Sequence, residues 1–187
     1  MRWVCLIFLI IFGVVVSIIQ PLQAKDPSSS PQKTSACDSF GVQKIQVKKD
    51  APAFTLKDLT GSEVTLKGYH GIPLLLFFWA SWCSACKEDL VLLEKYFIKN
   101  KGRMEILTIA IDGERENRIK SIIKKEQITL PVLLDRKEMV ARTYGVRMVP
   151  TAFLINGESM LQGIIVGQRD WCAPEAHLAI QELLGLR

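Results

Sequence analysis

The sequence is poor in the residues that most often build metal sites. Among its 187 residues there are two histidines, His70 and His177, and they stand far apart. Five cysteines occur, and apart from the pair Cys83 and Cys86 they are unclustered. A structural zinc site needs four ligands, usually in two close pairs. This distribution therefore argues against a metal centre, and we predict none.

Long apolar runs are also missing, except for one at the start of the chain. It covers residues 3–19, follows Arg2 and precedes residues 20–24, which end in Leu22-Gln23-Ala24, an acceptable though imperfect cleavage site. A basic residue, an apolar stretch and small residues at the cleavage site are typical of an export signal. We predict a signal peptide over residues 1–24. Because the run is nearly long enough to span a membrane, retention as an anchor is the alternative. Both predict a periplasmic or other extracytoplasmic location.

The charges show no concentrated patch. Lys and Arg number 24 against 19 Asp and Glu, a net charge of +5, and the two signs are interspersed. This balance predicts solubility and gives no sign of nucleic-acid binding. Residues 25–40 are rich in Ser, Pro, Gln and Lys, which is typical of a flexible linker. Residues 41–187 then have the length of one domain.

Strand and helix patterns alternate through this domain. Two short alternating runs, residues 51–56 and 63–66, flank a turn at Gly61 and predict an N-terminal β-hairpin. Further strands are predicted over 73–79, 104–111, 131–134, 151–155 and 160–166, and helices over 87–99, around 119–123, over 138–144 and from Pro174 onward. This order predicts an α/β fold with a mixed sheet flanked by helices.

The chemistry is predicted to reside in Cys83 and Cys86. They follow the buried strand 73–79 and open the helix predicted over 87–99. A helix N-terminus stabilises a thiolate, so Cys83 is expected to be the attacking sulfur. Cys86, one turn further on, can resolve a mixed disulfide. The alternatives for this pair are a purely structural disulfide or half of a metal site.

Three segments in this order resemble the thioredoxin superfamily. Residues 77–87, Phe-Phe-Trp-Ala-Ser-Trp-Cys-Ser-Ala-Cys-Lys, are similar to its active-site segment. Residues 51–61 resemble the opening of its TlpA/ResA-like branch, and residues 144–155 resemble the segment that carries a cis-proline. The resemblance covers about residues 49–184 and implies a thioredoxin-like fold with an added N-terminal β-hairpin.

The resemblance also implies further site residues. Pro150 would be cis, with Val149 beside Cys83, and this backbone would pair with a substrate chain as an added strand. Trp82 would pack around the site and contact substrate. The branch has a glutamate three residues after its second cysteine, whereas this sequence has Asp89 there and Glu88 just before it. Asp89 and Glu88 are therefore the expected proton acceptors, and a first-turn acid that merely suits the helix dipole is the alternative for Asp89.

Two further cysteines remain after removal of the leader. Cys37 and Cys172, together with the redox pair, give an even number, which in an oxidising compartment favours disulfide pairing. We hypothesise a structural disulfide between Cys37 and Cys172 that fixes the N-terminal segment to the last helix.

The sequence thus predicts an extracytoplasmic thiol:disulfide oxidoreductase that reduces protein disulfides and needs no cofactor. By resemblance its partners would be exported proteins such as an apocytochrome c, and a membrane thiol electron donor. Two other functions stay open. Peroxiredoxins share an opening like that of residues 51–54, so a thiol peroxidase is one. A copper chaperone that uses the two thiolates as soft ligands is the other.

Overall fold

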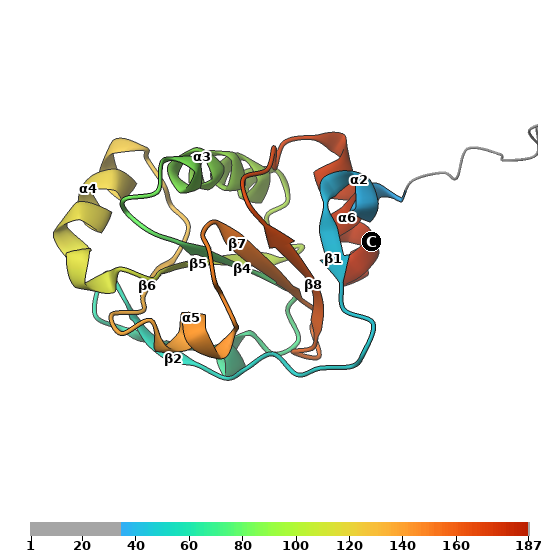
Figure 1. The fold of residues 1–187 in the computed structure, drawn as a ribbon, viewed down its shortest axis with the longest axis horizontal. Coiled ribbons are helices and arrows are strands. Elements are labelled where there is room, and N and C mark those ends of the chain that lie inside the picture. Colours follow the sequence, from blue (N-terminus) through green and yellow to red (C-terminus); the bar gives the residue numbers. More distant parts are fainter. Residues whose placement is uncertain (1–34, 187) are drawn as a thin grey trace, which may run out of the picture. The chain divides into compact units, whose positions relative to one another are not determined.

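Within the described part of the chain, eight strands form one mixed sheet in the order β1-β8-β7-β4-β5-β6-β2-β3 (Figure 1). β4 pairs in parallel with β5, and β5 with β6, whereas the other neighbours are antiparallel. The strands are β1 (Val42–Lys44), β2 (Thr55–Asp58), β3 (Glu63–Thr65), β4 (Leu74–Trp79), β5 (Glu105–Ala110), β6 (Val132–Leu134), β7 (Thr151–Ile155) and β8 (Leu161–Val166).

This computed structural model describes residues 35–186. The predicted signal peptide, residues 1–24, and residues 25–34 of the predicted linker lie outside the described residues. None of the helices in residues 35–186 combines the length and the apolar composition that crossing a membrane requires.

Helices lie on both faces of the sheet. Figure 1 shows α3 on one face and α5 on the other, with α2 beside α6 next to β1. The helices are α2 (Ala36–Phe40), α3 (Ser84–Lys99), α4 (Glu116–Lys125), α5 (Met139–Thr143) and α6 (Pro174–Leu184), with short 3-10 turns η2 (Leu66–Tyr69) and η3 (Gly113–Arg115). The predicted α/β class, with a mixed sheet flanked by helices, is confirmed.

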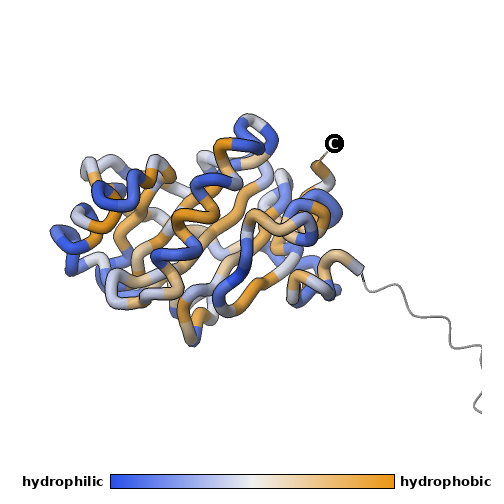
Figure 2. The backbone as a smooth tube through the Cα atoms, turned by 90° about the horizontal axis from the view of Figure 1, so that it is seen from above, coloured by the Kyte–Doolittle hydropathy of each residue, from blue (hydrophilic) through white to orange (hydrophobic). Residues whose placement is uncertain are grey.

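The central strand β4 divides the core into two clusters. Its six residues are at most 1% exposed. Since successive side chains of a strand point to opposite faces, alternate residues of β4 enter different clusters. The α3-side core includes Leu75, Phe77, Trp79, Leu90, Trp171 and Ile180. The α5-side core includes Phe54, Leu76, Phe78, Tyr144 and Phe153. In Figure 2 the hydrophobic colour follows the inner strands, while the outer turns of the helices are largely hydrophilic.

The fold begins earlier than the predicted boundary at Gly41. The Ser35 side chain accepts the N–H of Asp38, and the Asp38 carboxylate accepts the N–H of Ser35, which together cap α2. Cys37 and Phe40 of this helix are buried in the α3-side core. The prediction of a flexible linker is therefore wrong for residues 35–40. The polar composition of this segment hides a capping box, Ser35 to Asp38, and the two apolar side chains of Cys37 and Phe40.

The first predicted strand is shorter than expected. β2 begins at Thr55 and pairs antiparallel with β3, so the two strands form a hairpin. The residues before it do not join this ladder: the N–H of Ala51 donates to Ser159 O over 2.9 Å instead. Pro52 follows and has no N–H to donate, which explains why the strand cannot start at residue 51.

Candidate functional site

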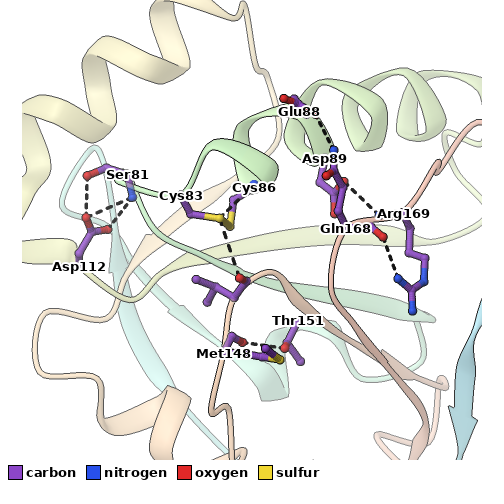
Figure 3. Close-up of a disulfide and its surroundings, with 11 residues drawn as sticks. Ser81, Cys83, Cys86, Glu88, Asp89, Asp112, Met148, Thr151, Gln168 and Arg169 are labelled. Carbon is purple, nitrogen blue, oxygen red and sulfur yellow. Dashed lines mark hydrogen bonds between the residues drawn. A yellow bond between two sulfur atoms is a disulfide. The ribbon is translucent and has the colours of Figure 1, made fainter.

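Cys83 and Cys86 form a disulfide at the start of α3, with their Cα atoms 5.3 Å apart (Figure 3). Cys83 is the N-cap residue of α3, and its sulfur accepts the N–H of Cys86 over 3.1 Å. The helix begins here because β4 ends at Trp79 and the chain turns at once, with the N–H of Cys83 donating to Ala80 O. Cys83 is 8% exposed and Cys86 is fully buried, so solvent reaches the first sulfur more readily than the second.

The turn before Cys83 is fixed by a carboxylate from the loop that follows the neighbouring strand β5. Asp112, just beyond β5, accepts the Ser81 hydroxyl over 2.6 Å and the Ser81 N–H over 3.1 Å (Figure 3). Sequence reasoning missed this pair. A usable signal was present, because β5 runs parallel to β4 and the first acid after it must emerge at the same edge of the sheet.

A cis peptide bond joins Val149 and Pro150, as predicted. The Val149 carbonyl oxygen lies 3.9 Å from the Cys83 sulfur. The segment is held on both sides, since the Thr151 hydroxyl donates to Met148 O and the N–H of Gly167 donates to Pro150 O, each over 2.8 Å. The predicted neighbourhood of Val149 and Cys83 is thus present.

Two large apolar side chains lie exposed near this segment. Trp82 is 56% exposed and Met148 is 60% exposed. Val149 is half-buried and Pro150 is buried. Trp82 was expected to contact substrate, whereas Met148 was not singled out from the sequence. A bulky apolar residue two positions before the proline is the signal that could have identified it.

The two acids expected to accept a proton differ in their surroundings. Asp89 is fully buried, and its carboxylate accepts the N–H of Arg169 over 3.3 Å. Burial raises the pKa of Asp89 to about 6, opposed by the Trp171 indole and by Arg169. Glu88 is exposed and accepts the side-chain N–H of Gln168 (Figure 3). The alternative of Asp89 as a surface acid is therefore wrong.

The predicted disulfide between Cys37 and Cys172 is absent, and both thiols are free. Cys37 is buried on α2, with its sulfur 3.9 Å from Ala179 O near the middle of α6. Cys172 is exposed just before α6, with its sulfur 3.9 Å from Leu92 O of α3. A disulfide joins sulfur atoms about 2 Å apart, whereas these two sulfurs contact different helices, α6 and α3.

In residues 35–186, no three or more His, Cys, Asp or Glu side chains are grouped in a way that could hold a metal ion. His177 packs beside Tyr96, with ring centroids 6.2 Å apart.

Comparison with known proteins places most of this fold in one family. A model described as the AhpC/TSA family matches residues 47–164. The match includes the disulfide and the cis-proline segment, and it excludes α2, β1 and α6.

The chain is similar to thiol-disulfide oxidoreductases called ResA. It is 31% identical to the one from Bacillus cereus over 68% of this chain and 73% of that protein. It is 35% identical to the one from Geobacillus thermodenitrificans over 66% of this chain and 71% of that protein. Among solved structures, the exposed lipoprotein thioredoxin Etrx1 from Streptococcus pneumoniae is 30% identical, with a TM-score of 0.59, over 68% of this chain and 98% of that one.

Proposed function

The chain belongs to the AhpC/TSA family and is a ResA-like thiol-disulfide oxidoreductase, and on this premise we propose that it reduces disulfides of exported proteins. The observation that carries the proposal is the Cys83–Cys86 disulfide at the start of α3, beside a cis-proline and one turn before a buried acid. The site thus combines a redox pair, a surface for an extended chain and a group that can take up a proton.

Cys83 is the attacking sulfur in this proposal. In the reduced protein its thiolate is stabilised by the N-terminus of α3, where the N–H of Cys86 points at the sulfur. The thiolate attacks one sulfur of the client disulfide, forms a mixed disulfide and releases the other client sulfur as a thiolate. The buried Cys86 then attacks the Cys83 sulfur. This step restores the Cys83–Cys86 disulfide and frees the second client thiol, so two electrons pass to the client.

Asp89 accepts the proton that Cys86 must lose before it attacks. The two residues are three positions apart on α3, so their side chains share one side of the helix. The Asp89 Oδ2 atom is buried and has no hydrogen-bond partner among residues 35–186. A carboxyl group with a pKa of about 6 is mostly ionised near neutral pH and still basic enough to act. Glu88, which is exposed and bound to Gln168, is the weaker of the two acceptors.

The client chain is held by Trp82, Val149 and Pro150. The polar backbone of Val149 lies beside Cys83, and an extended client segment can pair with it as an added strand. Trp82 supplies an exposed apolar surface at the same edge. This arrangement suits a flexible, unfolded client, such as an apocytochrome c with oxidised haem-binding cysteines.

Residues 1–24 direct the domain out of the cytoplasm, as a cleaved signal peptide or as a membrane anchor. There, a membrane thiol protein returns electrons to the Cys83–Cys86 disulfide. A reductase in an oxidising compartment needs such a dedicated donor, because the compartment itself does not keep the pair reduced.

The test uses trapping of the mixed disulfide in a Cys172→Ser background, which removes the exposed free thiol. The Cys86→Ser variant should accumulate a client bound to Cys83, whereas the matched Cys83→Ser variant should accumulate none. Graded glutathione or dithiothreitol buffers then give the reduction potential of the pair. A potential well below that of the compartment supports the reductase, and a strongly oxidising one makes it a disulfide donor. Turnover of hydrogen peroxide, or a stable copper complex without thiol exchange, would favour one of the two other functions.

A further inference from the structure

The buried acid Asp89 is covered by a segment that the family match does not include. This segment, residues 167–171, follows β8 and leads into α6. Its residue Arg169 donates its main-chain N–H to Asp89 Oδ1 over 3.3 Å. The same residue reaches in the opposite direction with its side chain, where Nε donates to Phe40 O over 3.0 Å. Arg169 therefore joins the acid on α3 to the end of α2.

The guanidinium of Arg169 fits closely against α2. Its Nη1 also donates to Gln168 O over 2.7 Å, so two carbonyl groups fix its orientation. Gly41, which ends α2 with a φ of +74°, would bring a Cβ atom to within 2.8 Å of Arg169 Nη2. A side chain at this position would thus collide with the guanidinium. In addition, a cation next to the last carbonyl groups of a helix is favourable.

Trp171 completes the cover over Asp89. Its side chain is 1% exposed and packs edge-on against Phe40, with ring centroids 5.4 Å apart. It also lies edge-on to Phe77 of β4 at 6.3 Å. Neither the indole Nε1 of Trp171 nor Oδ2 of Asp89 has a hydrogen-bond partner in the described part of the chain. The two groups are close enough for the indole to lower the pKa of Asp89.

We infer that α2 and Arg169 are positioning elements of the redox site, which exclude water from Asp89 and so set its strength as the proton acceptor for Cys86. This inference rests on the role proposed for Asp89. Phe40 packs against Trp171, which covers the acid. The side chain of Arg169 binds this segment to the end of α2. Release of α2 from this segment would remove both contacts.

The direction of the effect follows from the charges near the acid. The charged side chains that act on Asp89 are Arg169, from the covering segment, and Glu88, from its own helix. Burial is the largest cause of its raised pKa. When α2 is displaced and water enters, the pKa of Asp89 should therefore fall from about 6 toward its ordinary value of 3.8. The pH at which the Cys86 step gains speed should fall with it.

Phe40→Ala tests the cover without changing a charge. The full chain is studied in mild detergent with the Cys83–Cys86 disulfide intact, so that no active-site thiol titrates. The carboxyl resonance of Asp89, assigned with Asp89→Asn, is followed by NMR from pH 3 to pH 8. We expect the pKa of Asp89 to fall by about one unit or more in Phe40→Ala. The matched control is Phe54→Ala, which removes a similarly buried ring from the α5-side core and should leave the titration unchanged.

Arg169→Lys is the second variant, in case Phe40→Ala does not fold. It keeps the positive charge but cannot make the two side-chain hydrogen bonds of the guanidinium together. The pKa of Asp89 should fall in this variant too, by less than in Phe40→Ala. Hydrogen exchange of the amides of residues 36–40 reports whether α2 has loosened.

The inference is overturned if α2 loosens in either variant and the pKa of Asp89 stays where it was. Failure of the proposed role of Asp89 would give a different experimental result. In that case Asp89→Asn would leave the pH profile of thiol-disulfide exchange unchanged, while the carboxyl titration would still respond to Phe40→Ala.

Discussion

The two sides of the sheet differ in how completely their buried polar groups are paired. On the α5 side, Phe78, Tyr144 and Phe153 pack with ring centroids 5.1–5.7 Å apart, and the Tyr144 hydroxyl donates to Pro52 O over 2.8 Å. On the α3 side lie all four buried side-chain N or O atoms that lack a partner in residues 35–186: Trp79 Nε1, Asp89 Oδ2, Tyr96 Oη and Trp171 Nε1.

This difference distinguishes a side of the sheet that mainly stabilises the fold from a side that carries the redox chemistry. A buried polar group without a partner costs free energy of folding, so the α3 side is less stable than its apolar packing alone would make it. The same side carries Cys83, Cys86 and Asp89. Among residues 35–186 the α5 side has no buried side-chain N or O atom without a partner, and its residues pack against the other face of the central strand. Substitutions on the two sides should therefore have different consequences, and they can be compared directly.

The largest effect is expected for Phe153→Ala on the α5 side. Phe153 is 3% exposed and contacts two aromatic rings. Removal of the ring should lower the free energy of unfolding by about 3–5 kcal/mol, as measured by urea denaturation of the oxidised protein. The reduction potential of the Cys83–Cys86 pair should not change, because the ring lies on the opposite face of the sheet. A shift in that potential would show that the two sides are coupled.

Asp89→Asn on the α3 side should have a smaller effect, and one that depends on pH. The native state raises the pKa of Asp89 from 3.8 to about 6, so between these values it holds a proton that the unfolded chain has released. The wild type should therefore lose stability as pH rises through this range, and the loss is complete above it. Relative to wild type, Asp89→Asn should gain about 1–3 kcal/mol in stability between pH 4 and pH 7.

Asp58→Asn is the control for this pH series. Hydrogen bonds from Thr60 hold the pKa of Asp58 below its ordinary value. Its contribution has the opposite sign, since it is present above the ordinary pKa and is lost as pH falls. Urea denaturation at pH 4, 5, 6 and 7 measures both variants. Parallel curves for wild type and Asp89→Asn would mean that burial does not raise the pKa of Asp89.

The redox pair and the strands around it could be predicted from the sequence because their signals are local. The unbroken apolar run of β4 predicts a strand buried on both faces, and two cysteines directly after it predict the start of α3. The cis bond before Pro150 came from a family resemblance rather than from physical reasoning, because proline in isolation favours the trans form.

The surroundings of Asp89 could not be predicted in this way. Arg169, Trp171 and Phe40 come from segments that lie some 80 and 130 positions along the chain from the groups they contact. No periodicity links them. The same limit explains the wrong prediction of a disulfide between Cys37 and Cys172. The number of cysteines is even, which favours pairing. Only the packed structure shows that the two sulfurs contact different helices, α6 and α3.

The smallest predicted effects come from a matched pair of substitutions, each of which removes one hydroxyl oxygen. One substitution lies on each side of the sheet, so the pair compares the two sides directly. Tyr144→Phe deletes a hydroxyl that has a partner and leaves Pro52 O unpaired, so the free energy of unfolding should fall by about 1–2 kcal/mol. Tyr96→Phe deletes a buried hydroxyl that has no partner among the described residues, so stability should stay the same or rise by up to about 1 kcal/mol. Urea denaturation of the two variants in one buffer makes the comparison. Equal losses in both would show that the Tyr96 hydroxyl is paired in solution, and that the two sides do not differ in the pairing of these hydroxyl groups.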